Sequence, residues 1–345
     1  MCGFFSKKKL LTILSIFLFC RMALCSQTLR ICIWEGNDKP VVDSFKGKYR
    51  GQLSLVKWNN KYLVINTMDI DEYLYGVIGK EMGKFWPFEA LKAQAVCSRT
   101  LVYYYKELAA KKVLPYDVSD TVYHQVYNGV YSEDESIVKA VEETSDEVLI
   151  GQDSEKGYNI VPSFFHACCG GHTTDASQVW GGDYPLLKGV EDPFCSESPF
   201  YWWSKRFTQN DLKNIVGIEV SDIHILAYDN SGRVAMIELS GKNGKKSMTG
   251  VNLRMKTVNV STTFNSDKTL PSVFFTVKKQ GSSFLFEGKG YGHGVGLCQW
   301  GAKKMAEQGK TYKEILKYYF PELCLACVEA DNDKILFDTG DNRTY

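Results

Sequence analysis

Alternating hydrophobic and polar positions dominate the first part of the chain and predict short strands. Residues 29–33 alternate in this way, and two similar runs at 53–57 and 62–66 are joined by an Asn-Asn turn. Residues 69–78 instead have the pattern of a short helix. The pattern therefore favours a small strand-rich region that leads into helices.

A proline opens the next predicted helix. Pro87 suits the first helical turn, where its missing N–H costs nothing, and Glu89 favours the same end of the helix. Small residues keep this helix slim to about Leu108, so we expect it to pack closely as a central element. These small residues are Ala90, Ala93, Ala95, Cys97 and Ser98.

The rest of the chain mixes strand and helix signals without a regular order. Helices are predicted at 132–143, 211–216, 299–308 and after 311, the first and last opened by the capping boxes Ser132-x-x-Glu135 and Thr311-x-x-Glu314. Strands are predicted at 148–150, 160–166, 220–228, 233–239 and 284–287. Because no βαβ series appears, we predict an α+β fold with mixed sheets around a central helix.

The character of the sequence changes at residues 205–275, where a brief helix is followed by a predicted hairpin. We interpret this stretch as an inserted, smaller β-rich subdomain. The catalytic core is then expected to consist of residues 26–204 and 276–345, after an N-terminal segment of residues 1–25.

Residues 1–25 have the pattern of an export signal. Three lysines at 7–9 precede an apolar stretch at 10–19, and Ala23-Leu24-Cys25 offers small residues at the two positions that a signal peptidase reads. The apolar run is short for a membrane span, so we expect an exported protein of the periplasm or cell envelope. A retained N-terminal segment or a lipid on Cys25 is the alternative, and the only membrane contact that we expect.

Composition and charge exclude some classes of partner. The 345 residues are 44% hydrophobic and 23% charged, which is ordinary for a globular protein with ample core. Without residues 1–25 the formal charge becomes −3, and the sequence has no long basic run. We therefore expect no nucleic-acid partner.

Glu81 is the strongest candidate for chemistry. It lies in the predicted break between two helices, with Gly79, Gly83 and Pro87 around it, in an aromatic-rich stretch. A carboxyl group held in an apolar cleft has a raised pKa and can donate a proton near neutral pH. Arg99, on the following helix, is expected to approach the same cleft. The alternatives are a surface carboxylate and a surface arginine.

A cluster of soft donors lies at His166, Cys168, Cys169 and His172, with Cys195 downstream. Zinc takes nitrogen and sulfur ligands in tetrahedral geometry, so the segment offers enough donors for a metal site. Its spacing matches no standard pair of zinc knuckles, and we assign neither a metal nor another cofactor to the chain. Structural thiols or a local disulfide are the alternative.

Two other segments have features suited to ligands. Gln125 and Tyr127 suit hydrogen bonds to N-acetyl and hydroxyl groups, unless they belong to an ordinary alternating strand. Residues 288–296 have glycine at every second position, but no βαβ unit surrounds them to make a dinucleotide site. These glycines favour a backbone that approaches a ligand closely or winds tightly around His293.

Five segments, in order, are GVIGKEM, EALKAQAVCSRT, HQVYNG, FFHACCGGHTTDASQVWGG and GKGYGHGVGLCQWGAKKMA. Together with DNSGRV and GVNLRM between them, they resemble the family of stage II sporulation protein D and the amidase enhancers of bacterial cell walls. The resemblance spans roughly residues 28–320, and the ordered set is specific although each piece alone is weak. It implies a lytic transglycosylase that acts on peptidoglycan strands, and the enhancer branch implies a cell-wall amidase as a further partner.

The resemblance also implies roles for single residues. Glu81 falls on the position of the family's catalytic acid, Arg99 on a cleft arginine, and Lys188 on a substrate-binding lysine. The motif positions expected to line or shape the groove are Gln125, Tyr127, His166, Thr173, His293 and Gln299.

Two departures from the family pattern concern metals. Some members carry a zinc cluster just before the motif at 124–129, where this chain has only His124 and has Val118 in place of a cysteine. Cys168, Cys169 and His172, by contrast, stand where small or polar residues are commoner.

A lone acid agrees with the implied reaction. Ordinary glycoside hydrolases need two carboxyl groups, whereas in a lytic transglycosylase the C6 hydroxyl of N-acetylmuramic acid is the nucleophile. The implied products are 1,6-anhydro ends on strands stripped of their peptides, with Glu81 as acid and then base. Two alternatives stay open: a non-catalytic glycan-binding enhancer of an amidase, and a metal-dependent hydrolase centred on His166 and His172.

Overall fold

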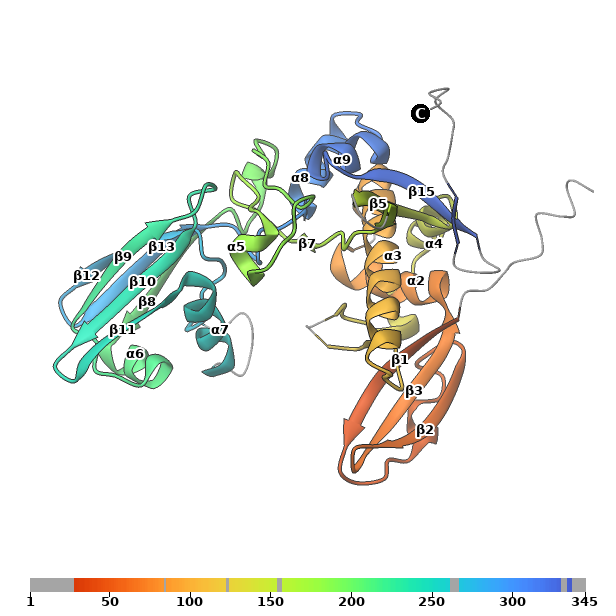
Figure 1. Ribbon diagram of the computed structural model, residues 1–345, viewed down its shortest axis with the longest axis horizontal. Coiled ribbons are helices and arrows are strands. Elements are labelled where there is room, and N and C mark those ends of the chain that lie inside the picture. Colours follow the sequence, from red (N-terminus) through yellow and green to blue (C-terminus); the bar gives the residue numbers. More distant parts are fainter. Residues whose placement is uncertain are drawn as a thin grey trace, which may run out of the picture.

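The computed structural model describes residues 28–83, 85–121, 124–153, 157–260, 267–329 and 334–336. The predicted export signal at 1–25 lies outside these residues. None of the described helices is long and apolar enough to cross a membrane. The chain forms two lobes, joined by a middle region that contains α5, β7 and α8 (Figure 1).

The first lobe begins with a four-stranded sheet in the order β2-β3-β1-β4. Its strands are β1 (Thr28–Gly36), β2 (Gln52–Trp58), β3 (Lys61–Asp69) and β4 (Val118–Ser119). β3 pairs antiparallel with β1 and β2, whereas β4 runs parallel to β1. The strands predicted from alternation at 29–33, 53–57 and 62–66 are thereby confirmed.

Helices pack beside this sheet around α3 (Phe88–Lys111), which contacts α2 (Ile70–Glu81), α4 (Glu135–Glu142) and strand β5. The buried face of α3 carries its alanines, so neighbouring helices can approach closely, as predicted from its small residues. Two 3-10 turns, η2 (Val42–Phe45) and η3 (Gly129–Ser132), complete this region.

Two local predictions in this lobe were wrong. α2 continues three residues beyond the predicted end at Ile78, so Glu81 is the last residue of a helix and not part of an open break. The capping box predicted at Ser132-x-x-Glu135 does not form. Asp134 caps α4 instead, since its side chain accepts a hydrogen bond from the backbone N–H of Ser136 at 3.1 Å.

A second sheet of the first lobe has the order β16-β15-β5-β6. It joins chain segments far apart in sequence: β5 (Glu147–Asp153), β6 (Gly157–Ile160), β15 (Cys324–Glu329) and β16 (Lys334–Leu336). The single strand predicted at 160–166 is split into β6 and the short β7 (Phe165–His166), because Pro162 cannot donate to a strand ladder.

The middle region brings β7 beside β14 (Leu297–Cys298), and the two run parallel. It also holds the short helix α5 (Ala176–Trp180) and the 3-10 turn η4 (Cys195–Glu197). α8 (Gln299–Glu307) and α9 (Tyr312–Tyr319) follow and pack on α3. The capping box predicted at Thr311 and Glu314 is confirmed by both of its hydrogen bonds.

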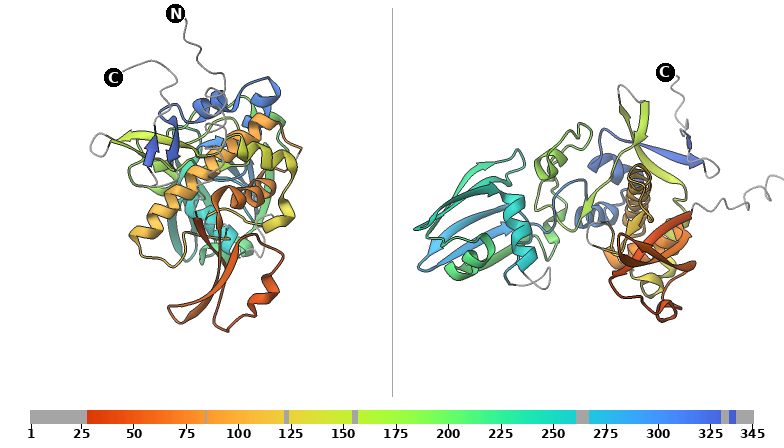
Figure 2. Two further views of the ribbon diagram at one scale, coloured as in Figure 1. Left: turned by 90° about the vertical axis from the view of Figure 1, so that its right-hand side faces the viewer. Right: turned by 60° about the horizontal axis from the view of Figure 1, so that its bottom comes forward.

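The second lobe contains two three-stranded antiparallel sheets and two helices (Figure 2). Its strands and helices are β8 (Trp202–Thr208), α6 (Gln209–Val216), β9 (Asp222–Tyr228), β10 (Val234–Gly241), β11 (Gly244–Thr249), α7 (Gly250–Val260), β12 (Phe275–Gln280) and β13 (Ser283–Lys289). The sheet orders are β11-β10-β9 and β12-β13-β8.

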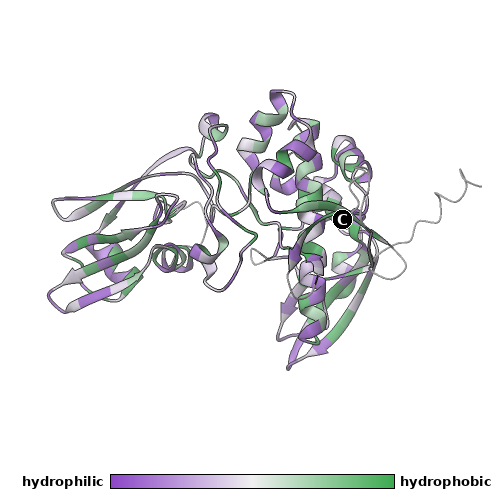
Figure 3. Cartoon of the chain, turned by 45° about the horizontal axis from the view of Figure 1, so that its top comes forward, coloured by the Kyte–Doolittle hydropathy of each residue, from purple (hydrophilic) through white to green (hydrophobic). Residues whose placement is uncertain are grey.

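This lobe has a hydrophobic cluster of its own, which runs in sequence from Phe207 to Phe286 and is separate from the large cluster of the first lobe. Hydrophobic and hydrophilic residues share most of its strands (Figure 3), as expected when one face of a sheet is buried. Because β13 pairs with both β8 and β12, the lobe extends past the expected limits of 205–275 at both ends. We propose 202–289 as the limits of the inserted subdomain.

Candidate active site

Glu81 is the C-terminal residue of α2, directly before the connection to α3. Its side chain is partly buried. The connection contains Trp86, whose ring meets the ring of Trp300 edge-on at 5.5 Å between centroids. Trp300 follows Gln299 on α8, and the Gln299 side chain hydrogen-bonds the Glu81 carboxyl group, so a segment distant in the sequence meets the end of α2.

The pKa of Glu81 is raised, and burial is its main cause, because a carboxylate loses hydration in such surroundings. Hydrogen bonds from the Gln299 side chain and from the backbone of Val126 favour the charged form and oppose this rise, as does the charge of Lys80. Burial prevails over these three contacts. The balance suits a group that holds a proton until a substrate takes it.

A buried chain of amide groups lies behind Glu81. The Gln299 side chain donates to the Gln94 Oε1 at 3.3 Å, and the Gln94 amide donates to the Ser98 hydroxyl at 3.0 Å. All three side chains are buried. Gln94 was not predicted as a site residue. One feature of the sequence could have identified it: Gln94 lies among the alanines of α3, on the face expected to be buried. A buried polar residue needs a hydrogen-bond partner.

Gln125 and Tyr127 support the loop whose Val126 contacts Glu81. Gln125 is buried and donates to the backbone carbonyl of Ser98 at 3.2 Å. The Tyr127 hydroxyl donates to the sulfur of Met68 at 3.2 Å, and its ring packs against that of Tyr73 at 4.9 Å. Both side chains therefore support the loop that contacts Glu81. Neither side chain has the exposed position that a hydrogen bond to a sugar requires. Residues 124–128 also form no strand.

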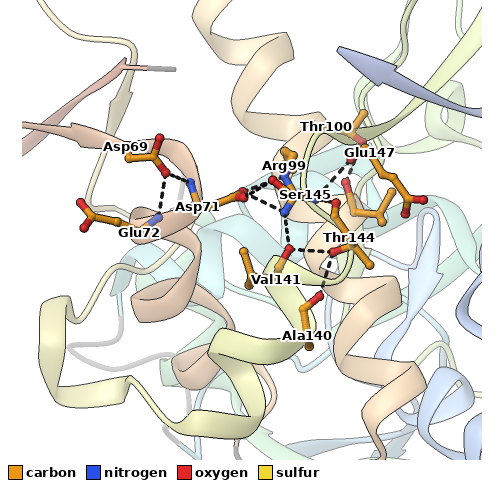
Figure 4. Close-up of polar contacts among 11 residues, drawn as sticks. Asp69, Asp71, Glu72, Arg99, Thr100, Ala140, Val141, Thr144, Ser145 and Glu147 are labelled. Atoms are coloured by element: carbon orange, nitrogen blue, oxygen red, sulfur yellow. Dashed lines mark hydrogen bonds and ion pairs between the residues drawn. The ribbon is translucent and has the colours of Figure 1, made fainter. Parts of the chain in front are cut away.

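The expectation that Arg99 approaches the same cleft as Glu81 was wrong. Arg99 is buried and lies at the opposite end of α2, where its guanidinium forms an ion pair with Asp71 at 2.8 Å (Figure 4). Asp71 and Glu81 are ten residues apart on one helix, which corresponds to about 15 Å. The other guanidinium N–H groups donate to the backbone carbonyls of Val141, Thr144 and Glu147. With all its donors in use, Arg99 holds helices together.

The rings of His166, which is buried, and His293, which is half-buried, lie with centroids 5.4 Å apart. Burial lowers the pKa of His293 to about 3 and that of His166 well below its ordinary value, so both rings are neutral. His293 Nδ1 accepts the backbone N–H of Val295 at 3.1 Å, which fixes its tautomer. The exposed ring of Trp180 lies 5.2 Å from that of His293. These histidines organise the turn of 288–296 around them.

Thr173 and Lys188 differ in exposure. Thr173 is fully buried, and its hydroxyl accepts the backbone N–H of Val190 at 2.7 Å, which is a structural role. Lys188 is exposed, and its ammonium forms an ion pair with Asp175 at 3.5 Å. Of the residues predicted to contact substrate, Lys188 is the one with a solvent-accessible charge. Gln299 is the one that the structure brings directly to Glu81.

The two histidines of the candidate donor set at 166–172 lie apart from its cysteines. No disulfide joins the cysteines in the described part of the chain. His166 faces His293, and His172 bonds the backbone carbonyl of Thr173, so neither imidazole joins the cysteines. Cys169 and Cys195 instead meet Cys298 and Asp192. His166 and His172 therefore do not provide the shared ligands that a metal-dependent hydrolase centred on them would need.

A hollow of about 720 Å³ lies on the second lobe, away from Glu81. Trp202, Tyr228, Phe274 and Lys289 are among its lining residues, and the ammonium of Lys289 lies 4.5 Å from the ring of Trp202. It contains aromatic faces of the kind that stack on sugars. Glu287 is its one lining acid, and Glu81 does not line it.

These features define the class of the protein: a two-lobed α+β protein with a partly buried glutamate, Glu81, at the C-terminal end of α2. A family model described as "Stage II sporulation protein" matches residues 58–150, which include Glu81 and α3. A domain of unknown function, DUF8618, matches residues 186–296, which include the second lobe.

Similar proteins extend the match over most of the chain. An uncharacterized protein of Brachyspira hyodysenteriae is 37% identical over 279 residues, 79% of this chain and 71% of that protein. The stage II sporulation protein D of Bacillus subtilis is 30% identical, over 74% of each chain. The amidase enhancer of the same organism is 31% identical, but the matched region is only 39% of its length. The chain belongs to the stage II sporulation protein D family.

Proposed function

We propose that this chain is a peptidoglycan lytic transglycosylase that cleaves the bond between N-acetylmuramic acid and N-acetylglucosamine, with Glu81 as general acid and base. The observation that carries the proposal is the raised pKa of Glu81, produced mainly by burial beside Gln299 and Val126. A protonated carboxyl group can give its proton to the bridging oxygen while that bond breaks.

One acid is enough because the substrate supplies the nucleophile. After the bridging oxygen takes the proton of Glu81, the carboxylate removes the proton of the C6 hydroxyl. That oxygen attacks C1 of the same sugar and closes a 1,6-anhydro ring. The intramolecular attack has the proximity advantage that a second carboxylate and a water would otherwise provide.

Other residues have supporting roles in this proposal. Gln299 and the Val126 backbone orient the carboxyl group of Glu81, and Trp86 and Trp300 offer ring faces to sugars. Arg99 is committed to Asp71, so Lys188 is the candidate for the lactyl carboxylate that peptide-free strands expose. We also propose that the chain acts after export, in the periplasm or cell envelope.

The test is a digestion of peptide-free glycan strands, followed by mass spectrometry of the new ends. The native protein should release 1,6-anhydro ends, and Glu81→Gln should lower the rate by about 10²–10⁴-fold, the usual contribution of a general acid. Glu72→Gln is the matched control, because Glu72 lies on the same helix and pairs with Arg50 on the surface. Hydrated ends from the native protein would refute the proposal, as would anhydro ends from Glu81→Gln at the native rate.

A glycan-binding enhancer of an amidase is the second candidate. One relative bears the name amidase enhancer, and the aromatic hollow at Trp202 and Lys289 offers a binding surface without an acid-base pair. This function predicts glycan binding without cleavage, equal in the native protein and in Glu81→Gln. Stimulation of a purified cell-wall amidase by both proteins would favour it over the transglycosylase.

A further inference from the structure

Three cysteines and one aspartate converge in the middle region. Cys169 follows β7, Asp192 precedes the turn η4, Cys195 is the first residue of that turn, and Cys298 ends β14. The ligand atoms of these four residues all lie within 4.8 Å of one another, and all four residues are buried. Three separate stretches of chain, up to 129 residues apart, therefore meet at one point.

The distances within this group fit a shared ion. The sulfurs of Cys169 and Cys195 are 3.5 Å apart, and a carboxylate oxygen of Asp192 lies 3.1 Å from the sulfur of Cys169. Around a tetrahedral zinc with Zn–S bonds of about 2.3 Å, neighbouring sulfurs are about 3.8 Å apart. A disulfide would need sulfurs about 2.05 Å apart. The four residues are thus spaced to bind one metal ion, and small shifts of their side chains would bring the ligand atoms to bonding distance.

Backbone groups around the sulfurs are arranged as donors. The N–H of Cys169 donates to the sulfur of Cys298 at 3.3 Å, and the N–H of Gly171 donates to the sulfur of Cys169 at 3.4 Å. Such N–H groups can hydrogen-bond the sulfur ligands of a bound metal ion. These contacts are separate from the distances between the ligand atoms and fit the same site.

A buried cation lies next to the group of three cysteines and Asp192. Arg233 is buried, and its guanidinium donates to the backbone carbonyls of Cys169 at 2.6 Å and His172 at 2.7 Å. Its positive charge lies next to the segment that carries the thiols. A site of three thiolates and one carboxylate leaves a net negative charge on a divalent ion, which a nearby guanidinium offsets.

We propose that Cys169, Cys195, Cys298 and Asp192 bind one zinc ion in a closed structural site. Sulfur ligands select zinc over the hard cations, and four protein ligands leave no position for a substrate. Cys168 lies beside this group, with its thiol 3.9 Å from the backbone carbonyl of Cys195, and can replace Asp192 as the fourth ligand.

The site has a consequence for Glu81. Cys298 is the N-cap residue of α8, and the next residue, Gln299, contacts the Glu81 carboxyl group. A metal bound at Cys298 would fix the start of α8 against the turn η4 and the segment after β7. It would thereby hold Gln299 in place without taking part in the reaction.

The test measures metal in the full-length chain, purified without chelator. We expect about one zinc per chain by inductively coupled plasma mass spectrometry, since closed sulfur sites bind zinc tightly. Cys195→Ser and Cys298→Ser should each lower the zinc content at least tenfold. Cys97→Ser is the matched control, because Cys97 is also buried and free but lies on α3 outside the cluster. It should keep its zinc.

Cobalt reconstitution keeps the proposal testable if a cysteine variant fails to fold. The native chain with Co²⁺ should show a sulfur-to-metal charge-transfer band and the intense visible bands of tetrahedral cobalt. Asp192→Asn should weaken Co²⁺ affinity and shift these bands. A folded native chain that binds no zinc and no Co²⁺ would overturn the proposal. So would a disulfide between Cys169 and Cys195 in the native chain, or unchanged zinc in Cys195→Ser.

Discussion

The two ends of α2 hold carboxyl groups in opposite electrostatic settings. At the first turn, Asp71 accepts two N–H groups of Arg99 and the hydroxyl of Ser145. At the last residue, Glu81 has amide donors and burial, and its pKa is raised. A carboxylate paired with a buried guanidinium stabilises the fold, whereas one left without such a partner keeps its proton for chemistry. The difference separates a structural acid from a candidate catalytic acid on one helix.

Breaking the pair at the first end should have the largest effect on stability. Arg99→Leu leaves Asp71 without its cation and leaves the carbonyls of Val141 and Thr144 without their donor. We expect a loss of about 3–5 kcal/mol in the free energy of unfolding, as for other broken buried pairs. Urea denaturation measures it. Lys111→Leu, which removes an exposed charge from the same helix, should leave the midpoint unchanged.

The isosteric changes Asp71→Asn and Glu81→Gln should act in opposite directions. Asp71→Asn removes the counter-charge of Arg99 and should cost about 2 kcal/mol, the range for a hydrogen bond to a charged group. The folded protein holds the Glu81 proton more tightly than the unfolded chain does, so native stability falls as the pH rises through the raised pKa.

Glu81→Gln removes this loss of stability. At neutral pH its melting temperature should therefore lie above that of the native protein, and the difference should disappear at acid pH. Melting curves across the pH range give both results. A variant that is less stable than the native protein at neutral pH would show that the Glu81 environment favours the charged carboxylate.

The variant Gln299→Leu tests the role of Gln299 at the Glu81 end of α2. The Gln299 hydrogen bond opposes the rise in the pKa of Glu81, so its loss should move the basic limb of the pH–rate profile to higher pH. We also expect kcat to fall by roughly tenfold, the equivalent of one hydrogen bond of about 1.4 kcal/mol. An unmoved limb would mean that Gln299 has only a packing role. Gln299→Asn should keep part of the native profile.

The smallest effect is expected for Lys188→Ala, because its charge is exposed. Loss of one exposed ionic contact is worth at most about 1 kcal/mol, so KM should rise by up to about fivefold with kcat unchanged. Lys213→Ala is the control, since Lys213 has similar exposure and an acidic partner, Glu219, on the second lobe. An unchanged KM would remove Lys188 from the proposed contact with the lactyl carboxylate.

Local rules predicted the fold better than they predicted the site. Alternation located β1, β2 and β3, and the Thr311-x-x-Glu314 spacing located α9, because these signals act over a few neighbouring residues. β8, β11 and β12 were missed. Their pairing depends on partners distant in sequence, and their own alternation is weak.

The site depended on contacts that no local pattern encodes. The resemblance to the family placed Glu81 and Gln299, and the structure brings them together from α2 and α8. It also placed Arg99 at the cleft, although the position on α3 faces the other end of α2. Cys298 and Asp192 entered the cysteine group only through the chain's tertiary course, since neither lies near Cys169 in sequence.

The most direct measurement is a ¹³C NMR titration of the side-chain carboxyl groups, with Glu81→Gln used to assign the Glu81 signal. The account predicts that the signal missing from the variant titrates above the ordinary range of a glutamate, since burial of this carboxyl group outweighs its hydrogen bonds. A Glu81 signal that titrates at or below the ordinary value would contradict the assignment of Glu81 as the proton donor.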